Sequence, residues 1–196
     1  MVKVAVLVSG GGTNLQALLD ASKYGGVPNA EIALVVASKA GVYALERAEK
    51  AGVESAVLSR KDYASQDEYD FAMVQLLKSH GIEVVVLAGF LSILGKAVID
   101  AYPERILNIH PSLIPSFCGK GYYGLKVHEA ALEKGVKVTG ATVHFVNEIP
   151  DGGKIIAQKA VEVKDDDTPE TLQKRVMEQA EWVILPEALR KVTDNM

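Results

Sequence analysis

Asn108 and His110 stand two residues apart at the end of an apolar run, Ile106–Ile109. Side chains of a strand alternate between its two faces, so this pair points the same way, and Pro111 stops the strand's hydrogen-bonding ladder directly after it. An amide and an imidazole placed together can stabilise the oxyanion that forms when a nucleophile attacks a carbonyl carbon, and a protonated imidazole is also a general acid. Neither residue is an obvious nucleophile, so direct transfer between substrates is favoured over a covalent intermediate on the protein. The spacing alone also allows a structural role, in which Asn108 caps a turn and His110 bonds the backbone.

Asp151 is a candidate partner of this pair. It precedes Gly152 and Gly153, which permit a sharp turn. A carboxylate beside His110 would favour the protonated imidazole and fix which ring nitrogen carries the proton. The residues alone favour a solvated aspartate in a turn.

A glycine-rich loop, Ser9–Asn14, lies between the first apolar run and the first helical stretch. Glycines let backbone N–H groups converge on an anion, the following helix N-terminus adds partial positive charge, and Thr13 and Asn14 add side-chain donors. The loop lacks the lysine of a nucleoside-triphosphate loop and has Leu15 where a dinucleotide loop has its third glycine. We expect it to bind a monophosphate, and a tight turn without a ligand is the alternative.

Two further segments have the chemistry to bind a ligand. The apolar stretch Leu87–Leu94 contains a glycine and can receive a flat ring, although a packed connection is equally plausible. Glu178 and Glu181 lie three residues apart on a predicted helix, which places them on one face. Glu181 can accept a hydrogen bond from a ribose hydroxyl, or it can be a surface charge.

No metal site is expected. His80, His128 and His144 share no metal-binding spacing, and no H-E-x-x-H or C-x-x-C pattern is present. His144 is interpreted as a packing residue of a strand. Cys118 has no adjacent base and is not expected to be a nucleophile.

The elements that position these residues alternate along the first 110 residues, which is typical of a doubly wound α/β sheet with mostly parallel, Rossmann-like strands. Strands are predicted at Val2–Val8, Ile32–Ala37, Ala56–Leu58, Val84–Ala88 and Ile106–Ile109, with helices at Leu15–Lys23, Tyr43–Ala51, Glu68–His80 and Leu94–Ala101. The pattern then changes to a helix at Leu125–Lys134 and an antiparallel extension, Thr139–Val146 and Lys154–Val163. One long helix follows, with Thr168 as its N-cap and Pro169 at its first position.

Composition limits the class of protein. The 196 residues, 48% of them hydrophobic, suit a single domain, 1–196, made of a phosphate-binding half (1–110) and a catalytic half (111–196). A net charge of −4 argues against a nucleic-acid partner. The apolar run at the N-terminus is too short for a membrane span. A single cysteine allows no intramolecular disulfide, which fits the cytoplasm.

Four segments in this order resemble the phosphoribosylglycinamide formyltransferases of purine biosynthesis, over nearly the full chain. They are Val8–Gln16, Leu87–Leu94, Asn108–Leu113, and His144–Val146 leading to Asp151-Gly152-Gly153. The resemblance implies the formyltransferase fold and transfer of a formyl group from 10-formyltetrahydrofolate to the amine of glycinamide ribonucleotide. It implies a cytoplasmic enzyme, monomer or homodimer, that needs no metal, nucleic acid or membrane.

The resemblance also implies a role for each motif. Asn108 and His110 would stabilise the oxyanion, and Asp151 would keep His110 protonated and help to move protons through water. The ribonucleotide would be bound by Gly11, Gly12, Thr13 and Asn14 at its phosphate and by Glu181 at its ribose. The folate would be bound by Gln66, Leu91, Ser92, Ile93, Leu94 and Asn108, and by the loop before Asp151.

Departures from the relatives concern the folate tail and one loop. Gln66 and Ser92 stand where relatives carry basic residues, which leaves the contacts to the anionic glutamate of the folate open. The loop Ser116–Gly124 is longer than its counterparts. Two formyl-folate alternatives are a deformylase and a methionyl-tRNA formyltransferase, which typically carry an additional N-terminal and C-terminal domain respectively. A non-catalytic sugar-phosphate-binding module is the alternative from another class.

Overall fold

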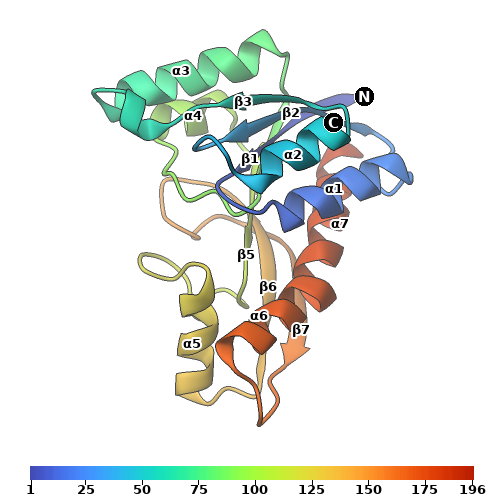
Figure 1. Cartoon of the computed structure of the whole chain (residues 1–196), viewed down its shortest axis with the longest axis vertical. Coiled ribbons are helices and arrows are strands. Elements are labelled where there is room, and N and C mark those ends of the chain that lie inside the picture. The colour runs from blue at the N-terminus through green and yellow to red at the C-terminus, as the bar shows by residue number, and fades with distance from the viewer.

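One seven-stranded sheet runs through the whole molecule (Figure 1), and the computed structural model describes residues 1–196. Its strands lie in the order β3-β2-β1-β4-β5-β6-β7. They are β1 Val2–Val8, β2 Ala30–Ala37, β3 Glu54–Val57, β4 Val84–Leu87, β5 Ile106–His110, β6 Val138–Phe145 and β7 Ile155–Glu162. The first five are parallel, and β6 and β7 are each antiparallel to their neighbour. The predicted α/β class with an antiparallel extension is confirmed.

Helices cover both faces of the sheet, and side chains of β1 alternate between the two cores. Val4, Val6 and Val8 belong to a core with α1, α2, α5, α6 and α7, whereas Ala5 and Leu7 pack with α3 and α4. The helices are α1 Thr13–Lys23, α2 Tyr43–Lys50, α3 Gln66–Ser79, α4 Lys96–Ala101, α5 Leu125–Lys134, α6 Pro169–Val176 and α7 Trp182–Thr193, with one short 3₁₀ turn, Arg60–Asp62. None of them combines the length and apolar character that crossing a membrane requires.

The strand order reverses between β1 and β4. From β1 the chain passes outward to β2 in one direction and, later, through β4 to β5 in the other. The carboxyl ends of these parallel strands meet at one edge of the sheet, where open α/β sheets bind their ligands. The glycine loop after β1, the segment after β4 and the end of β5 therefore come together.

The C-terminal helix differs from the prediction of one continuous helix. Its start is as predicted: Thr168 and Thr171 form a reciprocal capping box, and Pro169 occupies the first turn. A π-helical turn, η2 Met177–Glu181, then separates α6 from α7. Its wider i→i+5 spacing rotates the following residues, so Glu178 is exposed while Glu181 is buried. The prediction that both share one face is wrong.

The start of α4 also differs from the prediction. The helix expected from Leu94 begins at Lys96, because the chain from Leu91 to Gly95 forms an irregular loop after β4. Leu91 and Ile93 are left 67% and 79% exposed on this loop, whereas Leu94 is buried. Two large apolar side chains thus face outward at the edge where the ligand crevice lies.

Candidate active site

Asn108, His110 and Asp151 lie together at the carboxyl end of β5. The amide nitrogen Nδ2 of Asn108 is 3.4 Å from Oδ1 of Asp151, and Nδ1 of His110 is 3.6 Å from Oδ2 of Asp151. Leu107 and Ile109 point into the larger core, so the strand's alternation directs Asn108 and His110 away from it. The arrangement unites two hydrogen-bond donors and a carboxylate that lie 43 and 41 residues apart in the chain.

The hydrogen bonds of His110 show which nitrogen is free to react. Its Nε2 lies 2.8 Å from the carbonyl oxygen of Phe117. A carbonyl only accepts, so Nε2 carries a proton in both the neutral and the charged imidazole. Nδ1, which faces Asp151, is therefore the nitrogen at which His110 gains or loses its proton.

Asp151 is held by its backbone and by its surroundings. It has a φ of 54°, and a Cβ at the nearby Gly153 would collide with the carbonyl oxygen of Phe145, so this turn requires glycine there. Burial would raise the pKa of the Asp151 carboxyl, but hydrogen bonds from His144 and from the Gly119 N–H, with the nearby histidine charges, lower that pKa below its ordinary value. Asp151 is therefore a carboxylate at neutral pH.

His144 belongs to this cluster, although the sequence indicated a packing residue. It lies opposite Asn108 in the β5–β6 pairing and is 2% exposed. Its Nδ1 is 2.8 Å from the carbonyl oxygen of Phe145, and its Nε2 is 3.2 Å from Nδ2 of Asn108 and 3.5 Å from Oδ1 of Asp151. With the Nδ1 proton donated to the Phe145 carbonyl, Nε2 of His144 accepts from Asn108 and orients its amide.

The glycine loop offers a set of free backbone donors. Gly12 is the left-handed N-cap of α1, with a φ of 72° and no side chain to cap the helix. None of the backbone N–H groups from Gly10 to Leu15 has a hydrogen-bond partner in the protein. Unpaired N–H groups at a helix N-terminus are suited to an anion. The hydroxyl Oγ1 of Thr13 lies 3.8 Å from the sulfur Sδ of Met177.

Asn14 and Glu181 form a buried pair at the other side of this loop. Nδ2 of Asn14 donates to Oε2 of Glu181 at 2.6 Å. Burial raises the pKa of Glu181 to about 6, while the hydrogen bond from Asn14 opposes that rise. Glu181 is not the surface charge that the sequence left open, and Asn14 directs its amide to this carboxylate.

Two cavities meet at the cluster. The smaller, about 240 Å³, contains Asn14, Glu181 and His110 in its wall. The larger, about 480 Å³, is lined by the loop Leu91–Lys96 and by the turn Val146–Pro150. Both share Phe90, Leu91, Asn108 and Asp151. Two ligands bound in these cavities would face each other across the amide of Asn108 and the carboxylate of Asp151.

Gln66 supports the wall of the larger cavity. Its Nε2 donates to Oδ1 of Asp70 at 2.7 Å and to the carbonyl oxygen of Ile93 at 3.2 Å. Its Oε1 accepts from Nε of Arg60 at 3.1 Å. Gln66 thus joins α3 to the loop Leu91–Lys96 and holds a guanidinium beside that loop.

The loop Ser116–Gly124 lies against the catalytic candidates. Besides the Phe117 carbonyl on His110, the backbone N–H of Gly119 donates to Oδ2 of Asp151 at 2.8 Å. Tyr122, Tyr123 and Gly124 line the smaller cavity. Sequence inspection showed that this loop is long but not that its backbone completes the site.

His128, at the start of α5, is a second residue whose position the sequence did not indicate. It lines the smaller cavity, and neither of its ring nitrogens has a hydrogen-bond partner. Burial, with a smaller contribution from the charge of His110, lowers the pKa of His128 to about 4. No three histidine, cysteine, aspartate or glutamate side chains are grouped as ligands for a metal ion.

Comparison with known proteins gives consistent matches. Residues 2–189 match the formyl transferase family. The trifunctional purine biosynthetic protein adenosine-3 of Gallus gallus is 49% identical over 99% of this chain and 19% of its own length. A phosphoribosylglycinamide formyltransferase of Haemophilus influenzae is 41% identical, with 100% of this chain and 89% of that protein covered. The crystal structure of glycinamide ribonucleotide transformylase 1 from Symbiobacterium toebii has a TM-score of 0.93 at 42% identity, covering 100% of this chain and 89% of that one. The chain spans only 14–19% of the length of trifunctional relatives such as those of Gallus gallus and Chironomus tentans.

Proposed function

Because this chain belongs to the formyl transferase family, we propose that it transfers the formyl group of 10-formyltetrahydrofolate to the amine of glycinamide ribonucleotide. The products are formylglycinamide ribonucleotide and tetrahydrofolate. The observation that carries this proposal is the meeting of two cavities at Asn108 and Asp151, which suits two substrates that exchange one small group. The proposal needs only these two small molecules and places the reaction in the cytoplasm.

The chemistry is a direct attack. The neutral amine of the ribonucleotide attacks the formyl carbon, a carbon–nitrogen bond forms, and the carbonyl oxygen becomes an oxyanion. Nδ2–H of Asn108 and Nδ1–H of protonated His110 donate to that oxygen. The bond to N10 of the folate then breaks as N10 takes a proton and the attacking nitrogen loses one, through water held by Asp151.

Preorganisation supplies most of the expected rate enhancement. Holding two substrates in contact is worth about 7–11 kcal/mol in well-oriented reactions, and each oxyanion donor contributes roughly 10²–10³ in rate. Asp151 and His144 would fix the donors before the substrate arrives, since the partly buried Asp151 contacts both Asn108 and His110 and the buried His144 contacts Asn108.

The ribonucleotide is assigned to the smaller cavity. Its phosphate would accept hydrogen bonds from the free N–H groups of Gly11, Gly12, Thr13 and Asn14, which no protein acceptor satisfies. Its ribose hydroxyls would donate to Glu181, whose second carboxylate oxygen has no partner. The glycinamide end then reaches Asn108 and His110, which line the same cavity.

The folate is assigned to the larger cavity. Its pterin would lie between Leu91, Ser92, Ile93 and Leu94 on one side and the turn before Asp151 on the other. Gln66 supports this wall through the carbonyl of Ile93. Arg60, which contacts Gln66 and has no carboxylate partner, brings positive charge near the loop where Gln66 and Ser92 bring none.

Variants of the catalytic candidates test the proposal. His110→Ala and Asn108→Ala should each reduce formyl transfer at least about 100-fold, because each removes one oxyanion donor. Binding of the ribonucleotide, measured by calorimetry, should persist, since its phosphate and ribose contacts lie elsewhere. Full transfer activity in both variants would refute the assigned chemistry.

A further inference from the structure

The glycine loop is bonded on one side only. The backbone N–H of Ala44 donates to the carbonyl oxygen of Gly10 at 3.2 Å, and Nε of Arg47 donates to that of Gly11 at 2.8 Å. The N–H of Gln16 donates to the carbonyl oxygen of Gly12 at 2.9 Å. Every carbonyl of the three glycines is therefore occupied, while the N–H groups from Gly10 to Leu15 have no protein partner.

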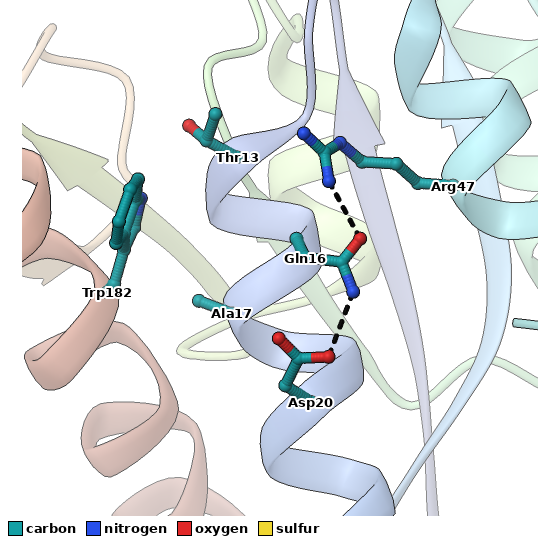
Figure 2. A pocket seen from close by; sticks show the side chains of 6 residues that line it. All are labelled: Thr13, Gln16, Ala17, Asp20, Arg47 and Trp182. Atoms are coloured by element: carbon teal, nitrogen blue, oxygen red, sulfur yellow. Dashed lines mark hydrogen bonds between the residues drawn. The ribbon is translucent and has the colours of Figure 1, made fainter.

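Arg47 makes the only side-chain bond to these carbonyls. Figure 2 shows it reaching from α2 toward α1, where its Nη1 donates to Oε1 of Gln16 at 2.8 Å. Gln16 in turn donates from Nε2 to Oδ1 of Asp20 at 2.9 Å. The guanidinium also lies 4.9 Å from the ring centre of Tyr43. Arg47, which is half-buried, thus contacts Gly11, Gln16 and Tyr43 directly, and Gln16 extends the hydrogen-bonded chain to Asp20.

The charge of Arg47 is not neutralised by a carboxylate. Its hydrogen bonds go to a carbonyl and to an amide oxygen, and it forms no ion pair. Arg47 also lines an open hollow of about 390 Å³ beside α1, which Thr13 of the loop lines as well. A positive charge thus stands directly behind a loop whose own residues include no lysine or arginine.

We infer that Arg47 is a positioning residue for the phosphate of the substrate. Its bond to Gly11 holds the carbonyl away from the anion and so directs the adjoining N–H groups toward it, and its charge stabilises the bound phosphate from behind the loop. The inference rests on the proposed function, since it assumes that a phosphorylated substrate occupies this loop. Arg47 of α2 thus supplies the positive charge that the residues of the glycine loop do not provide.

The chain offers a matched control. Lys50 lies on the same helix and 5.1 Å from the centre of the same Tyr43 ring, but it does not contact the glycine loop. Arg47→Met and Lys50→Met each remove one positive charge above Tyr43 and keep most of the side-chain volume. Only the first removes the bond to Gly11.

The test measures the dissociation constant of glycinamide ribonucleotide by calorimetry and the KM of each substrate in the transfer assay. Arg47→Met should weaken ribonucleotide binding about tenfold, which is near the lower limit for one charge-assisted hydrogen bond, and leave the folate KM and kcat within about twofold. Inorganic phosphate should compete with the ribonucleotide in the wild type and less well, by a similar factor, in Arg47→Met. Lys50→Met should change each value less than about twofold.

Several outcomes would overturn the inference: equal affinity in Arg47→Met and wild type, an equal loss in Lys50→Met, or a loss shared by the folate. Absence of competition by phosphate in the wild type would also overturn it. If Arg47→Met unfolds, Arg47→Lys replaces it in the test, because it keeps the charge but not both hydrogen bonds of the guanidinium. The dissociation constant of Arg47→Lys should rise less than tenfold but more than that of Lys50→Met. A wild type that binds the ribonucleotide but shows no transfer would instead refute the proposed function.

Discussion

Replacing Asp151 with asparagine tests how much the Asp151 carboxylate contributes to the proposed action of His110 on the oxyanion. The carboxylate lies 3.6 Å from Nδ1 of His110, a separation at which the attraction between unit charges is about 4–5 kcal/mol at an effective dielectric constant of about 20. Water and the asparagine dipole would recover part of this energy, so we expect a loss of about 3–4 kcal/mol for the protonated imidazole. If transfer requires that form, the rate at pH 7 should fall roughly 10²–10³-fold.

Asp151→Asn is well matched to this question, because the asparagine side-chain oxygen can still accept from the Gly119 N–H, which Asp151 binds at 2.8 Å. The loop Ser116–Gly124 should therefore keep its place, and thermal unfolding should confirm that the variant is folded.

The pH dependence tests whether Asp151 acts as a carboxylate. The pKa of the Asp151 carboxyl is lowered below its ordinary value, so the wild type should keep the carboxylate over the whole pH range assayed, and the ratio of variant to wild-type rate should stay constant over that range. Taking the ratio removes the effect of protonating the substrate amine, which is common to both proteins. The assay is the initial rate of formyl transfer between pH 5.5 and 8.5 at saturating substrates. A deficit below tenfold, or one that disappears as the pH falls to 5.5, would refute the reasoning.

Three other variants probe the ribonucleotide and amide contacts. In Gly12→Val, the φ of 72° and an Ala44 side chain 2.7 Å from the new Cβ should weaken ribonucleotide binding far more than folate binding in calorimetry; equal losses would contradict the division of the sites. Glu181 has a pKa of about 6, and ribose donors favour its charged form, so the ribonucleotide KM should rise more steeply as the pH falls through 6 in the wild type than in Glu181→Gln, where only the substrate phosphate, with a second pKa of about 6, still titrates. An equally steep rise in Glu181→Gln would exclude Glu181 as a source of the pH dependence. His144→Phe should lower kcat about tenfold with both KM values unchanged, because the amide of Asn108 loses the nearer of its two acceptors and is oriented only by Asp151. Unchanged kcat would show that this contact is not needed.

The sheet and the end of β5 were predictable because local patterns determine them. Continuous apolar runs indicated buried parallel strands, and the alternation of side chains with Pro111 behind them indicated that Asn108 and His110 share an end and a face. The glycine loop was predictable for the same reason, since only glycine adopts the φ of Gly12 without strain beside Ala44.

Contacts between distant elements were not predictable from single residues. His144 faces Asn108 only because of the register between β5 and β6, and no residue near it marks that register. The π-turn that buries Glu181 against Asn14 contains neither proline nor glycine. Arg47 appears in the sequence as one of several charges on a short helix, and its contact with Gly11 depends on how α2 packs on the loop. In each case, tertiary packing decides the role.

The proximity of Asp151 to His110 is an intermediate case. The turn chemistry of Asp151-Gly152-Gly153 indicated a bend, and only the resemblance to formyltransferases indicated its partner. The structure brings the two side chains together through the β6–β7 connection. The positive φ of Asp151 and its hydrogen bond from the Gly119 N–H indicate that both the turn and the loop Ser116–Gly124 hold Asp151 in place.

The most direct test of the central claim is a balance of products. Purified protein is mixed with glycinamide ribonucleotide and 10-formyltetrahydrofolate, and formylated ribonucleotide and tetrahydrofolate are followed together. We expect both to appear at equal rates, with no free formate. Formate and tetrahydrofolate without formylated ribonucleotide would contradict the account and indicate a deformylase or a different acceptor. No turnover, with the ribonucleotide still bound, would indicate a binding module.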